Sequence, residues 1–217
     1  MNNWNQILRK KVYSPHEPDD FVMSFVALLK GEKTSRVLDL SCGAGRHLIY
    51  AAKQGFEAYG IDFSGTGLIM AKKRLKKQKL NASLVRCDMR TLPFVSSFFD
   101  AVVCTRAIYH QKLAAMQETI SEIRRVLSKK GFVLADFLSR KTYSYGKGVK
   151  VEEHTFIEEE GVEKGVIHHF TDKKELRRLF EDFKILNLDL SEKEVEGKLR
   201  SRWVITATIK MDSELGK

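Results

Sequence analysis

Four polar side chains stand at or just after the ends of apolar segments in this sequence. Asp39, Asp62 and Asp88 can accept hydrogen bonds from hydroxyl, amino and N–H groups, and Thr105 follows an apolar run at residues 101–104. If the apolar segments are parallel strands, their carboxyl ends meet at one edge of a sheet, where the ligands of open α/β sheets bind. The four positions therefore predict a binding site for a polar ligand.

The first acidic position leads into a glycine-containing loop, S-C-G-A-G at residues 41–45, which opens a helix at about Arg46. Glycines let the backbone approach a ligand closely, and free N–H groups at a helix start favour polar or negative atoms. These features are typical of a nucleotide-cofactor loop. A dinucleotide loop of the form G-x-G-x-x-G needs a third glycine where Leu48 stands, and a P-loop needs G-K-[ST] after its glycines, so neither pattern is complete here.

Strands and helices alternate through the part of the chain that carries these positions. Strands are predicted at residues 36–40, 56–61, 83–85, 100–104 and 132–136, and helices at 46–54, 64–77 and 112–127. Gly55 and Gly131 mark helix ends, and Ser64 is expected to cap the helix that follows it. This alternation predicts a parallel sheet with right-handed crossovers.

The N-terminal segment has a different pattern. Residues 1–34 contain two apolar runs at helical spacing, separated by two prolines, and we predict an N-terminal helical cap there. Asp19 or Asp20 is expected to cap the second helix. The cap either packs against the rest of the chain or covers the cofactor pocket as a lid.

The C-terminal part is predicted to cover and close the sheet. Strands are expected at residues 149–157, 166–170, 184–190 and 203–210. The first two lie in a turn-rich stretch, 139–170, which we interpret as a small inserted β-lid. Thr171 or Asp172 is expected to cap a short helix, and a longer polar connection is expected between the last two strands. Residues 1–217 are therefore predicted to form a single domain.

The sequence D-L-S-C-G-A-G-R-H at residues 39–47 resembles motif I of the class I S-adenosylmethionine-dependent methyltransferases. The usual form of that motif is D-x-G-C-G-x-G, so Ser41 replaces one glycine. Similarity continues at G-I-D-F-S (60–64), C-D-M (87–89), L-P-F (92–94), F-D-A-V-V (99–103) and E-I-R-R-V-L (122–127). Arg46-His47 and Gly55-Phe56 are similar to the small-molecule branches of the tellurite-resistance and ubiquinone-biosynthesis types.

This resemblance implies the fold and the cofactor. The fold would be a Rossmann-like, doubly wound α/β sheet of seven strands, mostly parallel with the last strand antiparallel. The cofactor would be S-adenosyl-L-methionine, with S-adenosyl-L-homocysteine as the product. Asp39 would anchor the methionine amino group, Asp62 would accept both ribose hydroxyls, and Asp88 would accept from the adenine amino group. The implied cofactor-binding residues are Asp39, Ser41, Cys42, Gly43, Ala44, Gly45, Asp62, Phe63, Ser64, Asp88, Met89, Thr105 and Arg106.

Methyl transfer requires alignment of the acceptor and exclusion of water, and it requires a base only when the acceptor must lose a proton. His110 and Tyr109, which follow the fourth strand, are the candidate catalytic residues, because an unperturbed imidazole titrates near neutral pH. The alternative for His110 is a hydrogen-bonded loop histidine. The substrate candidates are Tyr13, Tyr143, Tyr145 and His168. Adjacent histidines at 168 and 169 would point to opposite faces of a strand, so we predict no metal site.

Composition limits the remaining possibilities. The 217 residues are 43% hydrophobic, contain no apolar run of membrane-spanning length and lack a signal-peptide pattern, so we expect a cytoplasmic protein with no membrane partner. The three cysteines form no C-x-x-C pair. The net charge of +10 owes much to a run of lysines and arginines between residues 72 and 79, and such runs are usually solvated helix faces.

We therefore predict a methyltransferase that acts on a small-molecule substrate as a monomer or homodimer. The alternatives are an RNA methyltransferase that uses the basic surface, so nucleic acid is the less favoured partner, and a non-catalytic protein that only binds S-adenosylmethionine.

Overall fold

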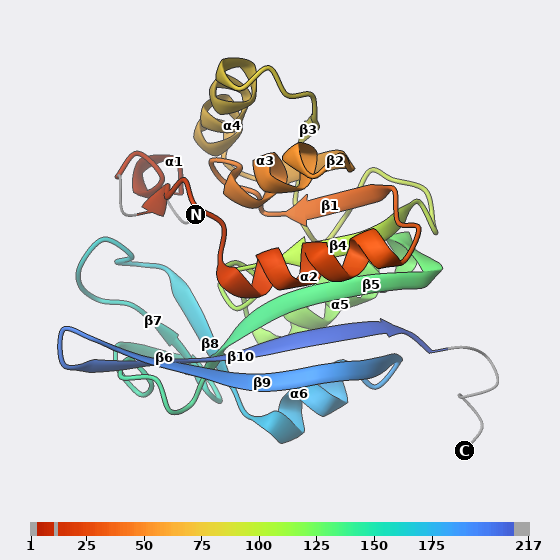
Figure 1. Cartoon of the computed structure of the whole chain (residues 1–217). Helices are drawn as coiled ribbons and strands as arrows, with labels where there is room; N and C mark the ends of the chain where they lie inside the picture. The colour runs from red at the N-terminus through yellow and green to blue at the C-terminus, as the bar shows by residue number, and fades with distance from the viewer. Residues whose placement is uncertain (1–3, 11–12, 211–217) are drawn as a thin grey trace.

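In the computed structural model, which describes residues 4–10 and 13–210, the main sheet has helices on both faces (Figure 1). Seven of its strands follow the spatial order β3-β2-β1-β4-β5-β10-β9. Their bounds are Arg36–Leu40 (β1), Glu57–Asp62 (β2), Ser83–Arg86 (β3), Phe99–Cys104 (β4), Leu127–Ser139 (β5), Phe183–Val195 (β9) and Lys198–Ile209 (β10). The first five are parallel, and β10 runs antiparallel to both of its neighbours. The predicted doubly wound sheet with an antiparallel last strand is confirmed.

Alternate residues of the central strands point to two separate cores. Val37 and Val103 pack on one face with α2 (Asp20–Gly31), α3 (Arg46–Lys53) and α4 (Gly65–Lys77). Leu38 and Val102 pack on the other face with α5 (Leu113–Val126) and α6 (Lys173–Leu179). Burial on both faces explains why these strands are almost continuously apolar. Strand order reverses between β1 and β4, and this switch point is where ligands of such sheets bind.

The long polar connection predicted between the last two strands is wrong. β9 and β10 extend into that stretch and are joined by only two residues, Glu196 and Gly197, whose φ angles are 53° and 68°. Two left-handed residues make a hairpin turn that matches the twist of the strands. The stretch is polar because this end of the hairpin is exposed to solvent, and not because it is a loop.

The insertion differs from the prediction in one respect. The strand expected over 149–157 is interrupted at His154, whose φ of 58° reverses the chain, so that β6 (Val149–Glu152) and β7 (Thr155–Ile157) form a hairpin. β7 pairs with β8 (Ile167–Thr171), and β8 runs parallel to the last two residues of β5. The insertion is therefore attached to the sheet at the carboxyl end of β5.

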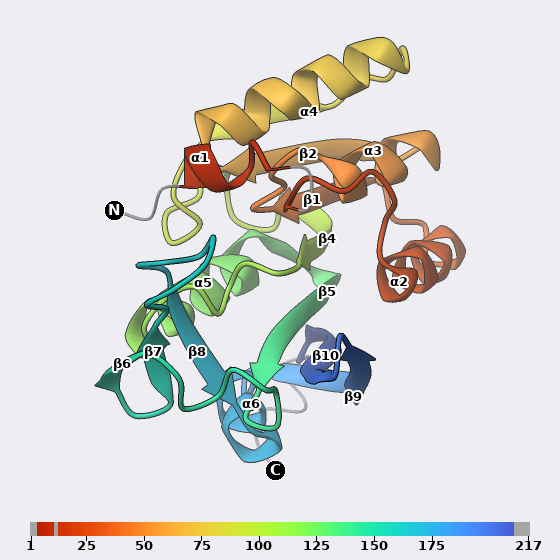
Figure 2. The same ribbon diagram turned by 90° about the vertical axis from the view of Figure 1, so that its left-hand side faces the viewer.

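The N-terminal segment begins with a short helix, α1 (Trp4–Ile7), which contacts α4. Figure 2 views the molecule from the side toward which β1 points, with α1 above that edge and β6–β8 below it. Asp19 precedes α2, Ser64 caps α4 and Asp172 caps α6, as expected from the sequence. Residues 1–3, 11–12 and 211–217 of the predicted single domain lie outside the described residues. None of the helices that the structure describes is long and apolar enough to cross a membrane.

The first turn of α4 lies directly against the loop that follows β1. A Cβ atom at Gly67 would lie 3.0 Å from the carbonyl oxygen of Gly43 and 3.0 Å from Leu8 Cδ1, whereas a Cβ at Gly65 would meet nothing closer than 3.9 Å. The absence of a side chain at Gly67 therefore sets the distance between α4 and the loop.

We expect Gly67→Ala to lower the free energy of unfolding by about 1–3 kcal/mol, because the new methyl group forces the helix away from the loop. Gly65→Ala is the matched control and should leave stability unchanged or raise it by up to about 1 kcal/mol, since alanine favours helices. Urea denaturation of both variants measures the difference. Equal effects of the two substitutions would contradict the close packing.

Candidate functional site

A cavity of about 800 Å³ lies at the carboxyl ends of β1, β2 and β4. Every site residue predicted from the sequence lines it except two. Ser64 is buried as the cap of α4, where its hydroxyl bonds Asn5 Oδ1 at 2.7 Å. Tyr145 lies outside the cavity because its hydroxyl bonds His154 Nδ1 at 2.7 Å and its ring packs against Phe156 and Phe170.

The loop after β1 follows a path that demands left-handed residues. Gly43 and Gly45 have φ angles of 51° and 80°, and a Cβ at Gly45 would lie 2.9 Å from Ala71 Cβ in α4. Ser41 also has a positive φ, 63°, which explains why glycine is the usual residue at this position of the motif. The Cys42 N–H donates to the carbonyl of Ile61 at 2.8 Å and so fixes the loop to β2.

Two buried carboxylates bind backbone N–H groups of this edge. Asp39 Oδ2 accepts from Leu48 N at 2.9 Å, while Asp62 Oδ2 accepts from Gly43 N and Oδ1 from Ser64 N, both at 2.7 Å. Burial raises the pKa of both carboxyls, and the N–H donors partly offset that rise. Asp62 thus joins the loops after β1 and β2 and lines the cavity.

The third acid is more exposed and is already paired. Asp88 accepts from Arg90 Nη2 at 2.7 Å and from Arg90 N at 2.9 Å, and the hydrogen bond with this guanidinium holds the pKa of Asp88 below its usual value. A ligand amino group would have to share this carboxylate with Arg90. Phe63 presents an exposed ring beside Asp62, with 53% of its surface accessible, and Met89 lines the same side.

Sequence reasoning missed the ion-pair cluster that attaches the N-terminal segment to the site. The carboxylate of Asp19 accepts from both Arg46 and Arg106, the latter at 2.8 Å, and lies 3.5 Å from His47 Nε2. Burial opposes ionisation of Asp19, but the hydrogen bond with His47 and the two arginine charges hold its pKa well below the usual range. The only sequence signal at Asp19 was its place before a helix.

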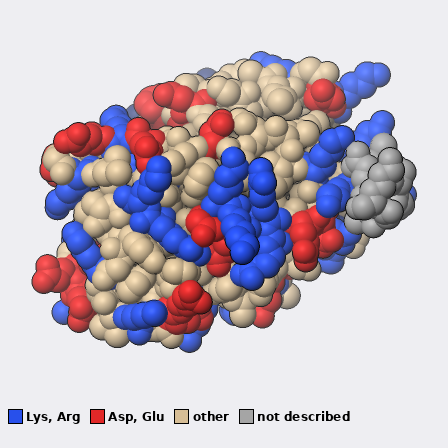
Figure 3. All heavy atoms as spheres, turned by 90° about the horizontal axis from the view of Figure 1, so that it is seen from below, with Lys and Arg blue, Asp and Glu red and all other residues tan. Residues whose placement is uncertain are grey.

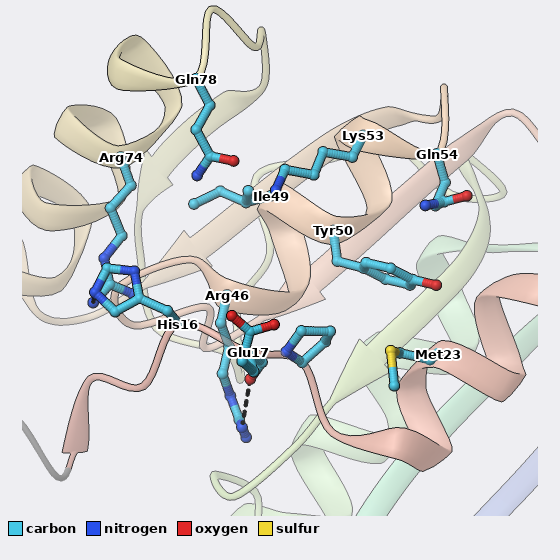
Figure 4. Close-up of a pocket in the computed structure, with 11 residues that line it drawn as sticks. His16, Glu17, Met23, Arg46, Ile49, Tyr50, Lys53, Gln54, Arg74 and Gln78 are labelled. Carbon is cyan, nitrogen blue, oxygen red and sulfur yellow. Dashed lines mark hydrogen bonds between the residues drawn. The ribbon is translucent and has the colours of Figure 1, made fainter.

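Arg74 of α4 reinforces this attachment. Its guanidinium donates to the carbonyls of Ser14, Pro15 and Ala44 at 2.6–3.1 Å. Figure 4 shows Arg46 and Arg74 reaching toward the N-terminal segment in a second hollow of about 330 Å³, with Arg46 bonded to the Glu17 carbonyl. The segment that covers the cofactor loop is therefore held from α3 and α4.

A buried ion pair, also missed, supports the opposite wall, where Arg202 lines the cavity and its partner Asp136 is fully buried. Asp136 of β5 accepts from Arg106 N at 2.6 Å and from Arg202 Nη1 at 2.9 Å, and Arg202 Nη1 also donates to Tyr109 Oη at 2.7 Å. Burial raises the pKa of the Tyr109 phenol, so this hydroxyl keeps its proton. The position of Asp136 at the end of a predicted strand was a signal for this site, whereas Arg202 carried none.

Two histidines and a glutamate complete this wall. His110 Nδ1 lies 3.3 Å from the Ile167 carbonyl, and His168 Nε2 lies 3.0 Å from Glu163 Oε2. Burial, and after it the neighbouring His168, lowers the pKa of His110 to about 3, so this ring stays neutral. Burial and the Glu163 carboxylate raise the pKa of Tyr13, which bonds Glu163, to about 12. As expected, His169 points the other way: it is fully buried and bonds Thr155 Oγ1 at 2.6 Å.

Comparison with known proteins supports the resemblance seen in the sequence. Residues 37–131 match the family model described as a methyltransferase domain. YqeM of Bacillus subtilis, which is named as a methyltransferase, is 34% identical over 123 residues, covering 56% of this chain and 49% of the relative. The chain spans about half the length of the first curated relatives it matches.

Solved structures show the same fold. A SAM-dependent methyltransferase from Methanosarcina mazei superposes with a TM-score of 0.76 at 20% identity, over 90% of this chain and all of that one. TehB from Haemophilus influenzae superposes with a TM-score of 0.70 at 16% identity, over 91% of this chain and 64% of TehB.

The left-handed serine in the cofactor loop can be tested by substitution. We expect Ser41→Gly to keep or raise the free energy of unfolding, because glycine adopts a positive φ without strain. Ser41→Val should lower it by about 1–2 kcal/mol, because the branched Cβ of valine fits a left-handed backbone less well than the Cβ of serine does. Ser191→Gly, in the extended strand β9, is the control and should lose about 0.5–1 kcal/mol through added chain entropy. Thermal unfolding measures all three. A loss of stability in Ser41→Gly would contradict the assigned conformation.

Proposed function

Because the chain belongs to the class I S-adenosylmethionine-dependent methyltransferases, we propose that it transfers a methyl group from S-adenosylmethionine to a small-molecule acceptor bound in the cavity at the carboxyl ends of β1, β2 and β4. The observation that carries the proposal is the single cavity that joins the cofactor loop to a wall of buried polar and aromatic side chains.

The residues present fit the cofactor. Asp62 lines the cavity, and each of its oxygens keeps a lone pair beyond its backbone bond, so the carboxylate can accept from two vicinal ribose hydroxyls. The exposed ring of Phe63 offers a face for the adenine, and the loop at 41–45 brings the backbone close to the methionine portion. S-adenosylmethionine supplies a methyl carbon that its sulfonium group has already activated.

A small acceptor is supported by the lining of the cavity. Four separate segments meet on the acceptor side: Tyr13 comes from the N-terminal segment, Tyr109 from the loop after β4, His168 from the insertion and Arg202 from β10. A volume of about 800 Å³ lies in the range of small-molecule sites. The chain's own contribution to catalysis is then to hold the acceptor in line with the methyl carbon and to exclude water.

An RNA acceptor is the second candidate, and the lysines of α4 are the observation that favours it. Lys72, Lys73 and Lys76 are exposed, and no ion pair involving them occurs among the residues that the structure describes. Basic side chains also occur far from α4, which argues against one continuous RNA-binding surface. Figure 3, seen from below, shows Lys and Arg on the opposite side of the molecule, interspersed with Asp and Glu. The positive charge is thus spread over several faces.

Transfer of a radiolabelled methyl group separates the two acceptors. The purified protein and labelled S-adenosylmethionine are incubated with a small-molecule extract and, separately, with total RNA. We expect label in a small-molecule product. Label in RNA alone would reverse the order of the two candidates, and binding of S-adenosylmethionine without transfer to either would favour a non-catalytic binding protein.

The role of Asp62 is testable by calorimetry. Asp62→Ala should weaken S-adenosylmethionine binding by on the order of 2–4 kcal/mol, because two hydrogen bonds to a charged group are lost. Asp100→Ala is the matched control: its carboxylate also accepts from two backbone N–H groups, of Ser35 and Arg36, but it lies at the start of β4, away from the cavity. Unchanged affinity in Asp62→Ala would show that the ribose binds elsewhere.

A further inference from the structure

The acceptor side of the cavity contains a carboxylate–imidazole pair whose free nitrogen faces the cavity. His168 Nε2 lies 3.0 Å from Glu163 Oε2, and the rings of His168 and His110 have their centroids 4.9 Å apart. All three side chains line the cavity. Glu163 belongs to the loop before β8, His168 to β8 and His110 to the loop after β4, so the group exists only in the folded chain.

The bonded nitrogen of each ring determines the role of the other nitrogen. Because the Nε2–H of His168 donates to Glu163, its Nδ1 carries the lone pair. No hydrogen bond to this Nδ1 occurs within residues 4–10 and 13–210, and it is not among the buried atoms without a partner, so it is an accessible lone pair on a residue that lines the cavity. In His110 the arrangement is reversed: Nδ1–H donates to the Ile167 carbonyl and Nε2 carries the lone pair.

The charges around the two rings distinguish them. Burial alone would raise the pKa of Glu163, but the hydrogen bond from His168 and the nearby His110 lower it below the usual value, so the carboxylate is ionised. An imidazolium at His168 would therefore stand against a negative charge, whereas the low pKa of His110 prevents that ring from holding a proton.

The other titratable groups facing this pair do not compete for the proton. Tyr13 also bonds the Glu163 carboxylate, and Tyr109 keeps its own proton. The positive charge of Arg202 is bound by Asp136, while Lys112 and Arg200, two other cations that line the cavity, are exposed to solvent.

We propose that His168 Nδ1 is the base that removes the proton from an O–H or N–H acceptor during methyl transfer, with Glu163 as the positioning residue behind it. The inference rests on the proposed function and extends it by naming the acceptor class. The acceptor's oxygen or nitrogen forms a bond to the methyl carbon as the carbon–sulfur bond breaks, with the electron pair moving to sulfur. The acceptor's proton moves to His168 Nδ1 and later to solvent.

Nitrogen NMR of protein labelled with ¹⁵N in its histidine rings tests the geometry without any acceptor. At neutral pH we expect His168 to be protonated at Nε2 and bare at Nδ1, and His110 to be protonated at Nδ1. Glu163→Gln should leave the proton of His168 shared between Nδ1 and Nε2, because the carboxylate that fixes it on Nε2 is gone. A proton resting on Nδ1 of His168, or no change in Glu163→Gln, would overturn the proposal.

Transfer of labelled methyl groups to the small-molecule extract tests the chemistry. His168→Asn should lose about 10²- to 10⁴-fold in kcat, the usual contribution of a general base, with unchanged affinity for S-adenosylhomocysteine in calorimetry. Glu163→Gln should also lower kcat with unchanged affinity for S-adenosylhomocysteine, because His168 no longer keeps its lone pair fixed at Nδ1. His154→Asn is the matched control, since this histidine lies in the same insertion but bonds Tyr145 and does not line the cavity.

The outcomes separate this inference from the proposed function. Full activity in His168→Asn, or a labelled product that had no proton to lose at the methylated atom, would overturn the base while leaving the methyltransferase intact. Failure of the unmodified protein to bind S-adenosylhomocysteine would overturn the proposed function, and the base assignment with it.

Discussion

The carboxylate of Asp62 is the interaction on which the site depends, because it bonds two backbone N–H groups that belong to different loops. Gly43 follows β1 and Ser64 follows β2, and one side chain at the end of β2 holds both at 2.7 Å. A buried carboxylate is costly unless it is hydrogen-bonded, so the two N–H donors stabilise it while it fixes their positions. The same carboxylate lines the cavity, and a structural contact is therefore also the proposed ribose contact.

The N-terminal segment completes the cavity through charge rather than through apolar packing alone. Asp19 pairs with Arg46 and Arg106, and Arg74 donates to three carbonyls across the same boundary. Charge-assisted bonds of this kind are stronger and more directional than neutral ones, which suits a segment that must lie over the cofactor loop in one position. Arg106 also donates its backbone N–H to Asp136, so the cofactor side and the acceptor side of the cavity meet at this residue.

The two sides of the cavity differ in how they are built. The cofactor side consists of loops that directly follow neighbouring parallel strands, and its residues lie between 39 and 106. The acceptor side is assembled from the N-terminal segment, the loop after β4, the insertion and β10, which lie far apart in the sequence. Tyr109 and Arg202, for example, form a hydrogen bond although 93 residues separate them. Loops that connect the strands of a rigid sheet can vary in sequence without altering the sheet, and most of the acceptor side consists of such connecting segments.

What the sequence determined by itself was local. The apolar runs, the glycines at 43 and 45 and the acids at strand ends were enough to predict a parallel sheet with a ligand site at its carboxyl edge, because φ preference, hydrophobic periodicity and helix capping each act within a few residues. The doubly wound order of seven strands and the identity of the cofactor were implied by the resemblance of the motifs to a known family. The same local reasoning misjudged the polar stretch before β10, where an exposed hairpin resembles a loop in composition.

Only the tertiary structure decided which side chains share the acceptor space. It removed Tyr145, whose neighbours in the insertion occupy it, and it added Glu163 and Arg202, the latter held by the buried Asp136. It also gave His110 and His168 different environments, because burial lowers the pKa of His110 whereas the Glu163 carboxylate lies beside His168. Burial and charge pairing depend on residues brought together from distant parts of the chain, and no local pattern in the sequence records them.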